Sequence, residues 1–260
     1  MMSRHDVLVG TCLAALMSLA ACVPHLEPVE PISTDRPDQT ESTTLVPAGM
    51  VQVEGGATVS RSGAQHSTSI GEALVRIGVR PSLELRIEPL SVTRIGSSGA
   101  RSYSGMEDLA VGLKTPLYRR STAAMPLVPD VSLLVATTLP TGAAAIGASG
   151  AEPEAKLAAQ WGIGTRAGLA SNLTLRRGRE AGEGYWERGL TASLGFDFTN
   201  RAGSYLEWYA IRDSRSVVAT QVINGGVTYR LTGDLQIDAR VGSALRERGR
   251  FAGVGVARRW

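Results

Sequence analysis

Residues 234–241 read Asp-Leu-Gln-Ile-Asp-Ala-Arg-Val, and polar and apolar residues alternate at every position. Successive side chains of a β-strand point to opposite faces, so a strand would place all the apolar residues on one side and the polar and charged ones on the other. A helix would scatter the charges around its circumference. The stretch therefore predicts a strand with one apolar face and one ionic face.

The same alternation recurs along the chain after Gly49, in about twelve segments separated by clusters of Gly, Pro, Asn, Asp and Ser. The predicted segments are 49–60, 69–79, 82–93, 105–117, 128–139, 153–163, 165–177, 186–198, 203–212, 217–231, 233–242 and 250–260. Short connections, as at Gly164 and Thr232, tend to alternate with longer ones rich in Gly and Ser, as at 141–151. Short periplasmic turns alternate in this way with longer outer loops in bacterial outer-membrane barrels. We therefore predict an all-β fold, an antiparallel up-and-down transmembrane β-barrel of about twelve strands over residues 49–260.

A soluble β-sandwich in the periplasm is the alternative, because its strands show the same alternation. Acids and bases on nearly every polar face favour the barrel. The final residue, Trp260, favours it too, since the last strand of outer-membrane barrels usually ends in an aromatic residue. That resemblance implies recognition of this strand by the barrel assembly machinery, and insertion among the lipids of a Gram-negative outer membrane.

The first 48 residues differ from the rest. Val7 to Ala21 form an apolar run that is too short for a spanning helix and ends in small residues, so we interpret residues 1–21 as an export signal. The ending Leu-Ala-Ala-Cys at 19–22 resembles the lipobox of bacterial lipoproteins, which implies lipidation of Cys22. An ordinary signal cut among the same residues would leave Cys22 free. Residues 22–48 are rich in Pro and polar residues, which predicts an extended tether or a periplasmic plug.

Composition excludes several function classes. The net charge of +3 is mild, and the sequence has no basic stripe with interleaved aromatic residues. We therefore expect no nucleic-acid partner. One cysteine would remain after signal cleavage, so we expect no intramolecular disulfide. The Cys and His residues do not have the spacing of a zinc site, so we expect no zinc site either. The three histidines, His5, His25 and His66, fall in the signal, the tether and a short predicted loop. With no base beside a nucleophile, we predict no catalytic residues, no cofactor, no metal and no enzyme activity.

Charged residues on the predicted inner faces are the candidate functional residues. A charge removed from water costs several kcal/mol unless it is paired, so such a lumen must be wet or braced by ion pairs. The set either braces the barrel or lines a passage for a small solute. The predicted lumen residues are Glu54, Arg76, Glu84, Arg86, Glu88, Asp108, Lys114, Glu154, Lys156, Arg166, Arg176, Glu207, Arg230, Asp238 and Arg240.

The charged motif Asp35, Arg36 and Asp38, with Pro37 between them, precedes the first predicted strand. It could plug the periplasmic mouth by pairing with lumen charges, or it could form a surface turn, which Asp and Pro favour.

Several stretches together resemble the family of putative MetA-pathway phenol-degradation proteins, over about residues 33–260. The stretches are Thr-Asp-Arg-Pro-Asp-Gln-Thr-Glu-Ser at 34–42, Val-Pro-Ala-Gly at 46–49, Val-Gln-Val-Glu-Gly-Gly at 51–56, Met-Glu-Asp-Leu-Ala-Val-Gly-Leu-Lys at 106–114, Thr-Leu-Pro-Thr-Gly at 138–142, Tyr-Leu-Glu-Trp-Tyr at 205–209 and Gly-Gly-Val-Thr-Tyr-Arg-Leu at 225–231. The resemblance implies a transporter or channel in the outer membrane for small hydrophobic, aromatic or polar solutes. A lipid-anchored structural or binding barrel without transport is the alternative.

Overall fold

The computed structural model describes residues 30–89, 91–97, 101–120, 127–246 and 248–260. The predicted signal at 1–21 and the predicted lipidation site Cys22 lie outside the described residues. No helix in the described part of the chain is long and apolar enough to cross a membrane.

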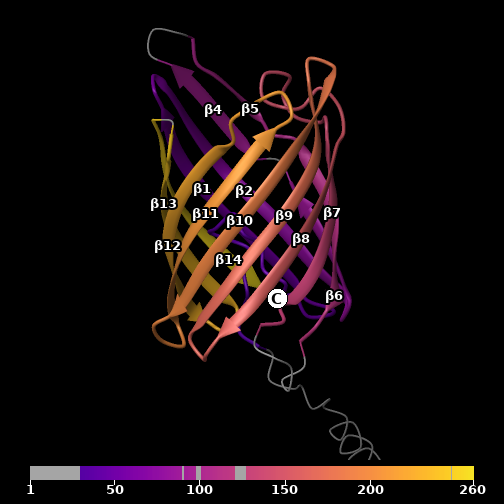
Figure 1. Cartoon of the computed structure of the whole chain (residues 1–260), viewed down its shortest axis with the longest axis vertical. Helices are drawn as coiled ribbons and strands as arrows, with labels where there is room; N and C mark the ends of the chain where they lie inside the picture. The colour runs from indigo at the N-terminus through magenta and orange to yellow at the C-terminus, as the bar shows by residue number, and fades with distance from the viewer. Residues whose placement is uncertain (1–29, 90, 98–100, 121–126, 247) are drawn as a thin grey trace, which may run out of the picture. The chain divides into compact units, whose positions relative to one another are not determined.

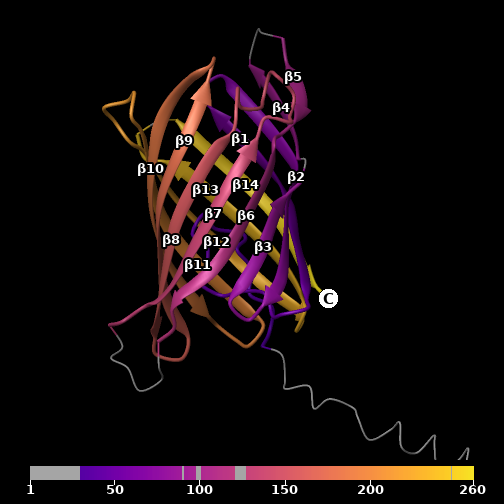
Figure 2. The ribbon, with the colours of Figure 1, turned by 90° about the vertical axis from the view of Figure 1, so that its right-hand side faces the viewer.

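Fourteen antiparallel strands form one sheet in the described part of the chain (Figures 1 and 2). The strands are β1 (Val51–Ser62), β2 (Gln65–Arg80), β3 (Leu83–Glu88), β4 (Val92–Ser97), β5 (Tyr103–Met106), β6 (Leu109–Tyr118), β7 (Asp130–Leu139), β8 (Glu152–Ile163), β9 (Ala167–Glu180), β10 (Glu183–Asp197), β11 (Ala202–Asp213), β12 (Thr220–Thr232), β13 (Leu235–Ala244) and β14 (Gly249–Arg259). Because β1 pairs with both β2 and β14, the sheet closes on itself into a barrel.

Two of the predicted strands are each divided in two. β2 pairs with β4 along its first half and with β3 along its second half, while β4 and β3 pair in turn with β5 and β6. The break coincides with a bend in β2, where Gly71 and Glu72 have φ angles of 100° and 37°. It also coincides with Pro89, which has no N–H to donate to a neighbouring strand. The prediction of a closed barrel of about twelve strands is confirmed, with extra strands from these divisions.

The prediction that His66 lies in a loop is wrong, because β2 begins at Gln65. The β1–β2 hairpin turns through only two residues, and Gly63 adopts the left-handed φ of 58° that this tight turn needs.

The interior of the barrel is polar and its outer surface is apolar. In β13, Gln236 and Asp238 are buried while Val241 is 64% exposed, as the alternation predicts. The largest fully buried side chains are all polar: Arg76, Lys114, Gln52, Glu54, Glu84, Glu207, Asn172 and Ser132. Apolar side chains would meet in the centre of a sandwich, so the sandwich alternative is wrong.

The two ends of the barrel differ in their connections. The short connections β2–β3, β8–β9, β10–β11 and β12–β13 lie at one end, which we call the short-turn end, together with Trp260 (Figure 1). β6 also ends and β7 begins at this end, and the eleven residues between them depart from the predicted alternation of connection lengths. The other end, called the loop end below, carries the β7–β8 and β11–β12 connections and also the two-residue β1–β2 and β9–β10 turns.

Residues 31–48 lie inside the barrel and are called the lumen segment. At the short-turn end, the Ile32 N–H donates to the Gly233 carbonyl at 2.7 Å, and the Gly49 N–H donates to the Gly78 carbonyl at 2.7 Å. Between these two points the segment contacts Glu207 and Asn172, which lie midway along their strands. The segment therefore enters and leaves the lumen through the same mouth.

Candidate functional site

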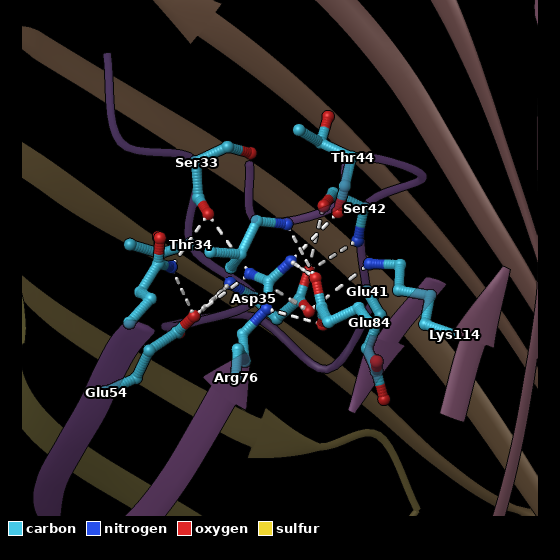
Figure 3. Close-up of polar contacts among 12 residues, drawn as sticks. Ser33, Thr34, Asp35, Glu41, Ser42, Thr44, Glu54, Arg76, Glu84 and Lys114 are labelled. Carbon is cyan, nitrogen blue, oxygen red and sulfur yellow. Dashed lines mark hydrogen bonds and ion pairs between the residues drawn. The ribbon is translucent and has the colours of Figure 1, made fainter. Parts of the chain in front are cut away.

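Asp35 lies at the centre of the polar contacts that hold the lumen segment (Figure 3). Its Oδ2 atom lies 2.6 Å from Arg86 Nη1, 3.3 Å from Arg76 Nη1 and 3.4 Å from Lys114 Nζ. Its Oδ1 atom accepts hydrogen bonds from the N–H and hydroxyl of Ser42. One carboxylate thus joins three cations of β2, β3 and β6 and also fixes the turn of the segment itself.

Carboxylates of the barrel wall accept backbone N–H groups of the lumen segment. Glu54 Oε2 on β1 accepts the N–H groups of Asp35 and Arg36, both at 3.0 Å. Glu84 on β3 accepts the Val46 N–H at 2.7 Å, and Glu207 on β11 accepts the Gln39 N–H at 3.0 Å. The segment has no secondary structure of its own, so these wall side chains satisfy donors that a strand would otherwise satisfy.

Arg76 connects the two limbs of the segment. Its guanidinium pairs with Glu84 at 2.9 Å and Glu54 at 3.1 Å, and it also donates to the carbonyls of Ser33 and Thr44. Arg76 is 0% exposed, so this burial of charge depends on the surrounding acids and carbonyls.

Neutral side chains hold the far side of the segment. Asn172 of β9 accepts the Glu41 N–H at 2.7 Å and donates to the Glu41 carbonyl at 3.0 Å. Ser132 of β7 donates to the Thr43 carbonyl at 2.9 Å. The hydroxyls of Thr40 and Thr191 lie 2.7 Å apart. Strands around most of the barrel therefore contribute contacts.

A second charged group surrounds Arg36. Arg36 pairs with Glu72 at 2.9 Å and lies 3.8 Å from Asp238, while Arg240 donates to the Pro37 carbonyl at 2.8 Å. Lys156 of β8 pairs with Glu41 at 2.6 Å on the opposite side. Both signs of charge therefore meet the segment.

The electrostatic surroundings of the three carboxyl groups on the segment differ. Burial raises the pKa of Asp35, but the charges of Arg76, Lys114 and Arg86 outweigh burial and hold this pKa well below its ordinary value. Burial also acts on Glu41, where the charges of Arg86 and Lys156 lower the pKa to about 2.

Asp38 behaves in the opposite way. Burial raises its pKa well above the ordinary value, and the nearby carboxylate of Glu207 raises it further. The Ser193 hydroxyl donates a hydrogen bond to its Oδ2 atom at 2.9 Å. The segment therefore carries two carboxyl groups that bind as anions and one that binds more readily when protonated.

The structure brings most of the predicted charges around the segment. The residues in direct polar contact with it are Glu54, Arg76, Glu84, Arg86, Lys114, Lys156, Glu207, Asp238 and Arg240. The residues that lie elsewhere are Glu88, Asp108, Glu154, Arg166, Arg176 and Arg230.

The outlying residues have other surroundings. Asp108, between β5 and β6, accepts the N–H groups of Gly142 and Ala148 and so holds the β7–β8 connection. Arg176 pairs with Glu187 at 3.0 Å nearer the loop end. Arg166 is exposed in the β8–β9 turn.

The neutral contacts were missed at the sequence level. Asn172 and Ser132 are uncharged, so a search for charged residues on the inner faces passes over them. Glu41 was missed because residues 31–48 show no alternating pattern. Without such a pattern, the sequence does not indicate that Glu41 faces Arg86 and Lys156.

A cavity of about 380 Å³ remains beside the segment. It lies toward the short-turn end, between the segment and β8–β13, and hydroxyl and amide side chains such as Thr34, Gln160, Ser193 and Gln236 line it. Among the described residues, the His, Cys, Asp and Glu side chains form no group of three that could hold a metal ion. The arrangement is suited to binding and closure.

Comparisons with known proteins agree with this architecture. A family model described as "Putative MetA-pathway of phenol degradation" matches residues 34–260. None of the curated proteins matches the sequence of the chain.

Several solved structures share the fold at low sequence identity. An outer membrane channel from Pseudomonas putida F1 is 12% identical, with a TM-score of 0.67, and the match covers 86% of this chain and 100% of that one. The NanC porin is 8% identical, with a TM-score of 0.55 and coverage of 80% and 98%. The KdgM porin in complex with disordered oligogalacturonate is 12% identical, with a TM-score of 0.52 and the same coverage. These three neighbours are an outer membrane channel and two porins.

Proposed function

The chain belongs to the family described as the putative MetA-pathway of phenol degradation, and we propose that it is an outer-membrane channel for small solutes whose lumen is closed by residues 31–48. The fold of its structural neighbours, which are outer-membrane channels and porins, supports placement in the outer membrane of a Gram-negative bacterium. No catalytic step is part of the proposal.

One observation carries the proposal: a charged lumen is occupied by a segment of the same chain that is held mainly by hydrogen bonds and ion pairs, with Ile32 and Val46 as its buried apolar side chains. Hydrogen bonds and ion pairs exchange readily with water, whereas a packed apolar core would lose its burial on opening. The wall charges can be hydrated when the segment leaves, so the barrel need not unfold for the lumen to open.

The wall alone does not set the solute class. Charges of both signs face the lumen, so the wall does not select an anion or a cation. The family description points to aromatic compounds, and one porin of similar fold is described in complex with oligogalacturonate. We propose small aromatic acids and sugars as the first solutes to test.

Liposome swelling tests passage directly. Purified wild type and a variant lacking residues 31–45 are reconstituted into liposomes and exposed to benzoate, a monosaccharide and a large dextran. We expect fast swelling with the two small solutes for the deletion variant, and slow swelling for wild type. The dextran controls for leaky vesicles.

Absence of uptake by the deletion variant would contradict the proposal. A variant that still migrates as a folded, heat-modifiable barrel but passes no solute would indicate the alternative, a barrel that binds or braces without transport.

Export and anchoring form a separate part of the proposal. We propose that residues 1–21 act as the export signal and that Cys22 carries a lipid, on the strength of the Leu-Ala-Ala-Cys ending at 19–22. Palmitate labelling of wild type and Cys22→Ala tests this, with label expected in the membrane fraction of wild type only. Unlabelled wild-type protein would contradict the anchor, and unlabelled protein in the soluble periplasm would contradict the membrane barrel as well.

A further inference from the structure

The outer surface of the barrel separates charge by sign. In β1, Thr58 faces the lumen, where its hydroxyl accepts a hydrogen bond from Arg240, so Val59 and Arg61 face outward. In β10, Glu187 pairs with Arg176 inside the barrel, so Arg188 faces outward. The acidic side chains of these two strands face the lumen, whereas their outward-facing charged residues are arginines.

Six of the described arginines that face outward near the loop end are called the arginine belt. They are Arg61, Arg94, Arg177, Arg188, Arg212 and Arg250. Arg177 lies over the outward ring of Trp186, 5.3 Å from its centroid, which confirms the outward direction on β9 and β10.

Strand register places belt arginines opposite one another. Arg61 on β1 is directly opposite Arg250 on β14, and Arg188 on β10 is directly opposite Arg212 on β11. Like charges at directly opposite positions destabilise a sheet. Among the described residues, no acidic side chain forms an ion pair with any of these four arginines. The repulsion is therefore uncompensated within the described part of the chain.

The belt lies one row beyond the apolar surface. On the same outward face, the next row toward the middle pairs Val59 with Ala252 and Leu190 with Ala210. Val59 is 55% exposed, so apolar surface continues up to the belt. In a membrane this position is where hydrocarbon ends and lipid head groups begin.

A hollow at the belt has room for an anionic group. It measures about 430 Å³ and is lined by Arg61, Arg248 and Arg250 together with Gly63, Ser243 and Gly249. Guanidinium groups bind phosphate through two parallel N–H donors, which makes arginine the preferred residue for phosphate contacts.

We propose that the arginine belt binds the phosphate groups of lipid A in the outer leaflet of the outer membrane. The phosphates neutralise the opposed arginine pairs while the acyl chains cover the apolar rows below. The inference rests on the proposed placement in the outer membrane and on the loop end facing outward, as the longer loops of outer-membrane barrels do, but it does not depend on solute passage.

Native mass spectrometry of the full chain in detergent tests the proposal. Wild type is titrated with diphosphorylated lipid A and with the same lipid after phosphate removal. The main variant carries Arg61→Gln, Arg188→Gln, Arg212→Gln and Arg250→Gln; a second carries lysine at the same four positions. The matched control is Arg258→Gln, which removes an outward arginine at the short-turn end, beside Trp260.

We expect wild type and Arg258→Gln to retain the phosphorylated lipid at least about tenfold better than the dephosphorylated lipid, as hydrogen bonds to charged groups imply. The glutamine variant should lose this preference, and the lysine variant should keep part of it. Equal retention of both lipids by wild type, an unchanged preference in the glutamine variant, or full displacement by millimolar inorganic phosphate would overturn the proposal. Liposome swelling by the deletion variant reports separately on the channel.

Discussion

At the scale of single residues, the lumen depends on how each carboxylate is paired. Asp35 is surrounded by three cations and remains ionised, whereas Asp38 lies beside another acid and favours its proton. A buried ion pair adds little net stability, but removal of one partner costs several kcal/mol because a charge is left unpaired. Single substitutions in the lumen segment should therefore have large and opposite effects on closure.

Asp35→Asn should loosen the lumen segment. The substitution removes the negative charge shared by Arg76, Arg86 and Lys114, and we expect docking to weaken on the order of 3 kcal/mol, or about a hundredfold in the released fraction. The released fraction can be measured with a glutamate-specific protease at pH 7. Glu41 is protected while the segment is docked, so the rate of cleavage after Glu41 is proportional to the released fraction.

The matched control is Asp234→Asn, which removes a carboxylate at the short-turn end, where it pairs with Arg259 outside the segment. Its cleavage rate should equal that of wild type. A rate for Asp35→Asn within a factor of about two of wild type would show that Asp35 does not hold the segment.

Asp38 should make closure depend on pH. Its pKa is raised in the docked state, so docking gains stability as the pH falls from that raised value toward the ordinary value near 4. The lowered pKa values of Asp35 and Glu41 keep their contribution intact across this window and remove it only below about pH 4. Closure should therefore strengthen on mild acidification.

Single-channel recording at pH 7 and pH 5 measures this effect. Wild type should open less often at pH 5, with a change of up to about tenfold for each pH unit inside the window. In Asp38→Asn this part of the pH dependence should disappear. Equal pH dependence in the two proteins would mean that another group is responsible.

At the scale of elements, the strands were predictable and the lumen segment was not. Alternation identified the strands because lipid and lumen impose opposite requirements on neighbouring residues, as the stretch at 234–241 shows. The division of β3 from β4 escaped prediction, since the bend in β2 at Gly71 depends on neighbouring strands. The path of residues 31–48 could not be predicted from the sequence either, because their backbone is held by side chains that lie far away in the sequence.

Gly78 illustrates how a strand admits the segment. A Cβ atom at this position would lie 2.1 Å from the Pro47 carbonyl oxygen and 2.5 Å from that of Val46. Gly78→Val should therefore displace the returning limb without changing any charge, and raise cleavage after Glu41 by at least about tenfold. Gly233→Ala is the control, because a Cβ atom there meets nothing within 4 Å. If both variants are cut at the wild-type rate, close packing against β2 does not position the segment.

At the scale of the whole molecule, the barrel reverses the usual distribution of residues, with charges inside and apolar side chains outside. This distribution, the approximate number of strands around the barrel and the family could all be inferred from the sequence, because they follow from alternation and from motifs spread along the chain. The partners in each ion pair could not be inferred in this way. They depend on how the barrel closes and so on the three-dimensional structure.

The most direct test of the account is the current through single barrels that lack residues 31–45, before and after a synthetic peptide of residues 31–48 is added. The account predicts steady conductance without the peptide, and block when the peptide is added from the short-turn side. A peptide with Asp35→Asn should block at least about tenfold more weakly. A deletion variant that conducts no better than wild type, or a barrel that the peptide does not block, would contradict closure of the lumen by this segment.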